Sequence, residues 1–185
     1  LAAPTGYDVK IASGETLDLK SQGTVTMPTG SLLQTKHMYT DSSNGQSVTS
    51  TSFIDITGLS LTITPSSSSN KVLITTNVHN YITSHASDGW NACDYRIAKT
   101  VGGTTTTVFD SFKNSGGGHG YTAGAYVRDD ETRFMWVTPI HFLDSPNTTS
   151  EITYKVKVRA KDSNFTVTFN DTYCRCSIVL QEIAG

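Results

Sequence analysis

The sequence has little charge and no long apolar run, and each of these shortages excludes a class of protein. Charged residues make up 16% of the 185 residues, and the formal net charge is −2 at pH 7. Nucleic-acid-binding proteins normally present a basic face that displaces counterions, so we expect no nucleic acid as a partner. No apolar run approaches the ~20 residues that span a bilayer, so we expect no membrane insertion either.

Cysteines are also scarce, which argues against a disulfide-stapled secreted domain. The three cysteines, Cys93, Cys174 and Cys176, are too few and too irregularly spaced for a disulfide framework. In a strand, Cys174 and Cys176 point to the same face, which makes a bridge between them awkward. A bridge from Cys93 to either one stays possible, but free, buried thiols are the favoured interpretation.

The N-terminal part contains a short repeat. Apolar pairs recur every eight residues, at Val9/Ile11, Leu17/Leu19 and Val25/Met27. Each unit predicts a strand of about four residues plus a glycine-containing turn, too small to bury its own apolar face. We expect three chains to intertwine into a β shaft over residues 1–30, although a β-meander folded onto the main domain would show the same pattern. The chain lacks an initiator Met and a signal-peptide pattern, so we expect a processed or excised piece of a longer protein.

From Ser31 onward the residues predict one all-β domain, 31–185. Val, Ile, Thr, Tyr and Phe are abundant and no segment keeps a helical period, while β-like alternation is clear in "YKVKVRA". The expected strands are 31–40, 48–57, 59–65, 71–83, 93–100, 105–112, 124–129, 132–144, 152–160, 165–169 and 176–183. About ten strands separated by polar turns predict an antiparallel, jelly-roll-like β-sandwich.

A serine tract, "SSSSN" at 66–70, separates two of these strands. A linker between domains would show a change of composition across it. Both sides are equally rich in Thr and β-branched residues, so the tract predicts a hairpin loop within one sheet rather than a tether.

Four segments resemble a known family. They are "MPTGSLLQ" (27–34), "TSTSFIDITGLSLTITPSSSSNKVLI" (49–74), "FLDSPNTTSEITYKVKVRA" (142–160) and "SIVLQEIAG" (177–185). They resemble the carboxy-terminal head domain of bacteriophage tail-fibre and related virion fibre proteins, especially those of marine and cyanobacterial phages. The resemblance runs from about Gly30 to the end, with no family motif between about His79 and Arg133. It implies a homotrimeric β-sandwich head on a fibrous stem, in a virion, with the N-terminal segment contacting other virion proteins.

No group of residues predicts catalysis, a metal or a cofactor. His79, Tyr81, Thr83 and His85 would share a strand face, but a zinc site there would need further ligands. The acidic run at 129–131 is more typical of a solvated turn, because calcium needs converging oxygens and glycoside hydrolysis needs two facing carboxylates. We therefore expect a protein that is not an enzyme.

Recognition of a host surface is better supported. Loops at the ends of a sandwich are held rigidly by the sheets, and an aromatic plate with polar neighbours suits the apolar face and hydroxyl rim of a sugar. The candidate receptor- or glycan-binding residues are His85, Asp88, Trp90, Asn91, His119 and Tyr121. The alternative for Trp90 is a structural plug at the sandwich edge, and Trp136 is expected in the core or in a trimer interface.

These observations predict a trimeric virion fibre head that adsorbs to a host-surface receptor, a glycan above all. The alternative is a capsid-decorating head fibre, or a tail-joining protein, that contacts other virion proteins. A fibre-borne glycan depolymerase is disfavoured by the small size and the lack of a paired acidic site. A cellular trimeric jelly-roll ligand is disfavoured by the phage-like segments.

Overall fold

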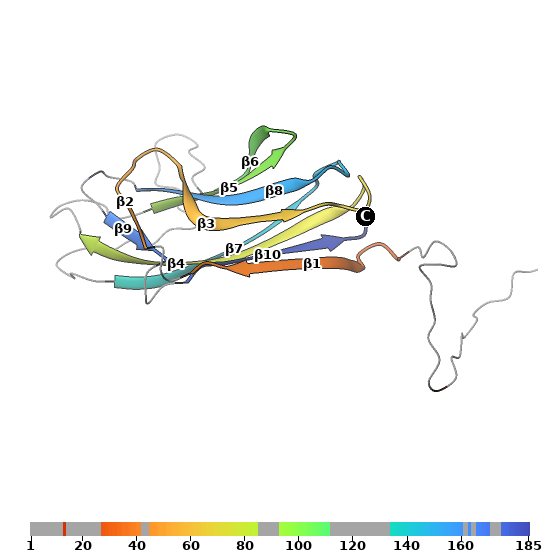
Figure 1. Cartoon of the computed structure of the whole chain (residues 1–185), viewed down its shortest axis with the longest axis horizontal. Coiled ribbons are helices and arrows are strands. Elements are labelled where there is room, and N and C mark those ends of the chain that lie inside the picture. The colour runs from red at the N-terminus through yellow and green to blue at the C-terminus, as the bar shows by residue number, and fades with distance from the viewer. Residues whose placement is uncertain are drawn as a thin grey trace, which may run out of the picture.

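The structure is a computed structural model and describes residues 13, 27–41, 45–84, 93–111, 134–160, 163, 166–170 and 175–185. Within these ranges every regular element is a β-strand. The strands are β1 (Leu32–Tyr39), β2 (Gln46–Val48), β3 (Ile54–Ile63), β4 (Lys71–Ser84), β5 (Cys93–Val101), β6 (Thr104–Asp110), β7 (Phe134–Asp144), β8 (Ile152–Ala160), β9 (Thr166–Phe169) and β10 (Ser177–Ile183). They form two antiparallel sheets that lie face to face (Figure 1), which confirms the predicted all-β sandwich.

The strand order is that of a jelly roll. Sheet A has the order β1-β10-β4-β9-β2, with β7 on the other side of β4, and sheet B has the order β3-β8-β5-β6. Strands β10 and β9 follow each other along the same edge of β4, opposite Lys71–Asn77 and Asn80–Ser84 respectively. Sheet A is therefore four columns wide, with β1/β2, β10/β9, β4 and β7 facing the four strands of sheet B, as in an eight-column jelly roll.

The core lies between the sheets and is built by alternation. In β8, residues at even positions from Ile152 to Ala160 are fully buried, and the residues between them are half exposed. The inward side of β4 contributes Val72, Ile74 and Val78, which are also fully buried. Full burial of each such side chain contributes roughly 1.5–3 kcal/mol. The faces predicted for "YKVKVRA" are confirmed.

Strand β3 corrects one expected boundary. The sequence predicted two strands, 48–57 and 59–65, separated at Gly58, whereas β3 runs unbroken through that glycine. Gly58 has a φ of 76°, and the pairing with β8 shifts register between Asp55 and Ser60, which defines a bulge. The Gln46 side chain accepts from Thr57 N at 2.8 Å and donates to Asp55 O at 3.0 Å, satisfying backbone groups that the bulge removes from the ladder.

The serine tract corrects a second expectation, that residues 66–70 form a hairpin loop. It connects β3 of sheet B to β4 of sheet A, so the predicted hairpin within one sheet is wrong. The tract crosses between the layers because its side chains are bound there. Ser66 and Asn70 both donate to the carboxylate of Glu182 on β10. It is nonetheless a structured connection rather than a tether.

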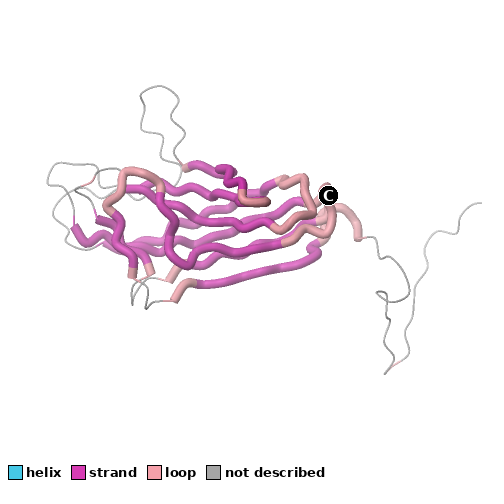
Figure 2. The backbone as a smooth tube through the Cα atoms, turned by 45° about the horizontal axis from the view of Figure 1, so that its top comes forward, coloured by secondary structure: helices cyan, strands magenta, loops and turns pink. Residues whose placement is uncertain are grey.

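The chain enters the sandwich and ends at the same place. Gly30 N donates to Ala184 O at 2.8 Å, and Ala184 N donates to Ser31 O at 2.9 Å. We call this the proximal end, and the tube in Figure 2 shows the strands running from it to the opposite, distal end. Of the predicted shaft, the structure describes only Ser13 and 27–30, so the shaft and the boundary at residue 30 stay predictions. The expected strand at 124–129 lies outside the described residues.

Candidate functional site

The two outer faces of the sandwich differ in chemistry, and the outer face of sheet B is charged. Its basic and acidic side chains pair as Lys155–Asp55 (3.1 Å), Lys157–Asp55 (2.5 Å), Arg159–Asp94 (2.9 Å) and Arg96–Asp110 (2.7 Å). The Phe53 ring lies under two of these cations, 3.9 Å from the Arg96 guanidinium carbon and 4.8 Å from that of Arg159. Each of these four cations thus has a carboxylate partner within the chain, with Asp55 serving both Lys155 and Lys157.

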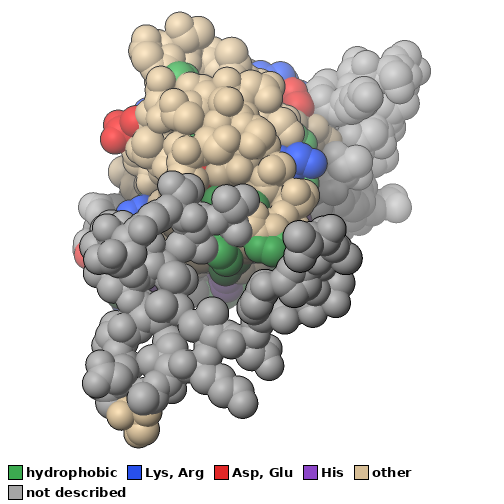
Figure 3. Space-filling view, turned by 90° about the vertical axis from the view of Figure 1, so that its right-hand side faces the viewer, with side chains coloured by type: hydrophobic (Ala, Val, Ile, Leu, Met, Phe, Trp, Pro, Cys, Tyr) green, Lys and Arg blue, Asp and Glu red, His purple; other side chains and the backbone are tan. Residues whose placement is uncertain are grey.

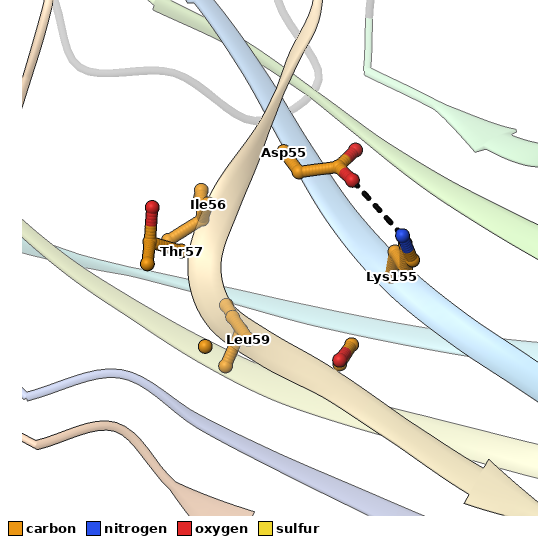
Figure 4. A pocket seen from close by; sticks show the side chains of 7 residues that line it. Asp55, Ile56, Thr57, Leu59 and Lys155 are labelled. Carbon is orange, nitrogen blue, oxygen red and sulfur yellow. Dashed lines mark hydrogen bonds and ion pairs between the residues drawn. The ribbon is translucent and has the colours of Figure 1, made fainter.

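A small depression accompanies the β3 bulge, at the edge of this face (Figure 4). It has a volume of about 200 Å³ and is lined by 55–60 of β3 and by Lys155, which donates to Asp55. Burial alone would raise the pKa of Asp55, but the hydrogen bonds from Lys157 and Lys155 outweigh it and lower that pKa. Ligand pockets are usually larger, ~300–1,000 Å³, and mostly apolar. The depression is a consequence of the bulge, and its two charged groups, Asp55 and Lys155, already bind each other.

The outer face of sheet A instead carries exposed apolar side chains interspersed with polar ones, such as Thr75, Asn77 and Gln181. Its exposed large hydrophobic side chains are Leu32 (51%), Tyr39 (60%), Met135 (53%), Val137 (46%) and Leu143 (47%). The strand register places Leu73, Val179 and Ile183 on the same face, half exposed. Figure 3 views the proximal end, where hydrophobic and histidine side chains gather along the lower margin, the side of sheet A. Among the described strand residues of this face, Lys71 at its proximal margin is the one with a formal charge.

Two buried polar clusters lie at the proximal end. In the first, Asp144 on β7 accepts from Lys99 Nζ of β5 at 2.8 Å and from the Tyr154 hydroxyl of β8 at 2.7 Å. Burial and the bond to Asp144 raise the pKa of Tyr154 well above its usual range, so its hydroxyl stays a donor. This cluster ties the two sheets together.

In the second cluster, Glu182 is 1% exposed and accepts four hydrogen bonds. The donors are Gln34 Nε2 (2.6 Å), Ser66 N (2.6 Å), Ser66 Oγ (2.8 Å) and Asn70 Nδ2 (2.6 Å). Burial alone would raise the pKa of Glu182, but these hydrogen bonds lower it. The cluster holds β1, the serine tract and the C-terminal strand together.

The two described cysteines, Cys93 and Cys176, are buried thiols that form no disulfide, as predicted. The Cys93 thiol donates to the Tyr95 hydroxyl at 3.0 Å, and the Cys176 thiol donates to the His79 carbonyl at 3.3 Å. Cys174 lies outside the described residues. Both thiols bind core polar atoms, which fits a structural role.

All six predicted recognition residues, His85, Asp88, Trp90, Asn91, His119 and Tyr121, lie outside the described residues, as does the acidic run at 129–131. The strand ends that flank them are described. β4 ends where β7 begins, with Ile82 opposite Phe134, and β5 begins opposite Ala160, at the end of β8. Both connections, 85–92 and 112–133, therefore join strand ends at the distal end, opposite the chain entry.

The remaining predicted residues have the following places. His79 and Tyr81 lie on the outer face of sheet A, opposite Val137 and Met135. No cluster of three or more His, Cys, Asp or Glu suited to a metal occurs among the residues that the structure describes. Trp136 packs against the core, half-buried, and donates from its indole N–H to Thr138 Oγ1 at 3.1 Å.

The exposed apolar residues on the outer face of sheet A were not predicted from the sequence. Their signal was the segment "FMWVTPIHFLD" (134–144), which is apolar at odd and even positions alike. A strand with one solvent-exposed face alternates apolar and polar residues, whereas a strand covered on both faces is apolar at successive positions.

Comparisons with known proteins identify no family. No protein-family model matches the chain, and no curated protein matches it. Among solved structures, one chain in the structure of the infectious bursal disease virus Gx strain is similar at 10% identity and a TM-score of 0.37, over 92% of this chain and 42% of that one. A chain of the Gt strain is similar at 12% identity and a TM-score of 0.33, over 100% and 47%. This chain thus spans less than half the length of either. Within the described ranges no helix has the length and apolar character of a membrane span.

Proposed function

We propose that this chain is a virion structural protein, the head of a homotrimeric fibre, and that its distal end contacts a host-surface receptor. The observation that carries the proposal is the separation of two ends. The chain enters at the proximal end beside its own C-terminus, held by the bonds of Gly30 and Ala184. The two connections with the predicted recognition residues join strand ends at the other end.

The placement of the fibre-like segments supports this assignment. Three of them meet at Glu182, through Gln34 of "MPTGSLLQ", Ser66 and Asn70 of the serine tract, and Glu182 of "SIVLQEIAG". The fourth supplies the pair of Asp144 and Tyr154. Parts of all four segments therefore meet at the end nearest the predicted stem, while the distal connections 85–92 and 112–133 lie outside these segments and are free to differ between receptors.

The proposed role is binding rather than catalysis. The charged side chains on the outer face of sheet B are paired with one another, and the two charged groups of the small depression, Asp55 and Lys155, bind each other. A glycan would bind through aromatic stacking and hydrogen bonds from the distal connections, with Trp90 as the stacking plate.

Trp90→Ala is expected to weaken adsorption strongly. The fluorescently labelled full chain would be incubated with intact marine cyanobacterial cells and with their purified lipopolysaccharide, and bound protein counted by flow cytometry and on a glycan array. Loss of a central aromatic contact at a recognition site typically costs 2 kcal/mol or more, roughly a thirtyfold loss of affinity.

Thr105→Ala, at an exposed position of β6, is the matched control and should bind like the parent. Retained binding in Trp90→Ala, with parental thermal unfolding, would remove Trp90 from the site. Binding of the parent to isolated phage capsids and to none of the cells tested would replace the receptor role with capsid decoration.

A further inference from the structure

Exposed hydrophobic side chains are segregated on this molecule. Among the described residues, each large hydrophobic side chain that is strongly exposed lies either on the outer face of sheet A or, as Met27, on the segment that leads into β1. Scattered exposed apolar residues are ordinary, but their concentration on one face of a domain points to an interaction surface. The paired charges on the outer face of sheet B provide the contrast within the same domain.

Strand β7 carries the strongest part of this signal. Its inward side packs Ile140 and, half-buried, Trp136 and Phe142 against the core. Its outward side presents Met135, Val137, Pro139 and Leu143, with one polar position at His141. A strand that is apolar on both sides is typical of a sheet covered on both faces. The inner cover is sheet B, whereas on the outer side Met135, Val137 and Leu143 are about half exposed.

We propose that the outer face of sheet A packs against two further copies of this chain around a threefold axis. The proposal rests on the trimer of the proposed function and assigns its surface. The face carries few formal charges, among them Lys71 and the Arg175 guanidinium 5.9 Å from the Tyr39 ring, and this suits an identical copy because a strongly charged face would repel itself. The chain outside the described head also points to this face, since the eight-residue repeat that needs partner chains leads directly into β1, an edge strand of sheet A.

The size of the face allows a modest interface with each neighbour. Four strands at about 4.8 Å spacing and up to 11 residues of about 3.4 Å give a flat footprint of roughly 700 Å². Two neighbours share this footprint in a trimer, so each pairwise contact is smaller than the ~800 Å² per partner of a standard interface.

The edges of sheet A favour packing through the face rather than strand addition. Lys36 on β1 pairs with Leu180 and so sits on the inward side, yet it is exposed. A charge at such a position blocks another strand from pairing there. On the other edge, β7 contains Pro139, which has no N–H to donate.

A threefold arrangement brings different edges together. If the central columns β10 and β4 line the axis, β1 of one copy lies beside β7 of the next. His37, Val179, Thr75 and His141 form one row across the sheet. With strands along the axis, His37 of one copy is then level with His141 of its neighbour.

Thiol labelling of the full chain tests the face. Val137→Cys should react with a maleimide at least about tenfold more slowly than Thr105→Cys, a control on the exposed edge strand of sheet B, once the rate of the parent is subtracted. In denaturant the two variants should label at equal rates. Light scattering on the same samples should give a mass near three chains.

Oxidative crosslinking tests the arrangement. Within one copy His37 and His141 are three strand spacings apart, about 14 Å, which exceeds the ~7 Å limit for a disulfide. The double variant His37→Cys/His141→Cys should therefore give covalent dimers and trimers on a non-reducing gel. The matched pair Thr62→Cys/Thr105→Cys, at the ends of the row Thr62–Thr153–Thr100–Thr105 on sheet B, should give neither.

The outcomes separate the two proposals. A threefold mass with equal labelling of Val137→Cys and Thr105→Cys would overturn the face and leave the trimer. A threefold mass with protected Val137→Cys and no crosslinks would overturn the β1-to-β7 arrangement. A mass of one chain would overturn the trimer itself and, with it, this assignment.

Discussion

Replacing Asp144 by alanine is expected to lower the free energy of unfolding by about 3–5 kcal/mol, because it leaves the Lys99 ammonium buried without its carboxylate. The pair is well shielded, with 17% of the Lys99 side chain and 9% of the Asp144 side chain exposed. The substitution also removes the acceptor of the buried Tyr154 hydroxyl. Urea unfolding followed by tryptophan fluorescence, with the m-value checked for constancy, would measure the change.

The control is Asp110→Ala, which breaks the Arg96 ion pair on the outer face of sheet B. There the side chains are 34% and 27% exposed, so solvent screens the pair and the expected change is about 0.2–1 kcal/mol. Equal destabilisation by the two substitutions would show that the proximal cluster does not hold the sheets together. If only Asp144→Ala lowers the free energy of unfolding by several kcal/mol, the Asp144 carboxylate is what holds the two sheets together at this end.

The fold was largely predictable because alternation is a local signal. β8 and β10 place every second side chain in the core, and their bounds follow from that period alone. β3 was divided wrongly because a glycine inside an alternating run marks either a turn or a bulge. The choice depends on Gln46, which lies nine residues before Asp55 and satisfies the freed backbone groups.

The sequence pattern did not show which of the two sheets each strand belongs to. The serine tract has the same composition on both sides whether it turns back within one sheet or crosses to the other. The deciding partner, Glu182, lies more than a hundred residues away. Long-range hydrogen bonds of this kind leave no periodic trace, although the resemblance to fibre heads already grouped these segments.

The candidate site was likewise predictable only in part. The predicted recognition residues fall in connections outside the described ranges, so their role stays a prediction, while their flanking strands fix which end of the sandwich they leave from. The sequence placed Trp136 of "FMWVTPIHFLD" in the core or in a trimer interface but made no prediction for the outward residues of this strand, because one strand cannot reveal which of its sides meets the second sheet.

Glu182→Gln is expected to make the free energy of unfolding depend less on pH in the acidic range. The pKa of Glu182 is lowered in the folded state by its hydrogen bonds, so the carboxylate stabilises the fold above its unfolded pKa of about 4.3, and this contribution disappears as pH falls through the lower folded value. In the parent, the free energy of unfolding should therefore fall steeply below about pH 5. The glutamine variant should fall less steeply, with Asp55, whose pKa is also lowered, supplying part of the remaining slope.

At neutral pH the same variant should be less stable by about 2–3 kcal/mol, because its amide cannot accept four hydrogen bonds and its N–H groups oppose the Gln34 and Asn70 donors. Glu151→Gln, at an exposed position just before β8, is the matched control and should keep both the parental stability and the parental slope. Urea unfolding at several pH values between 3 and 7 would measure both quantities. A parental slope in Glu182→Gln would mean that the carboxylate does not hold β1, the serine tract and β10 together through its charge, and that the proximal end is stabilised by packing alone.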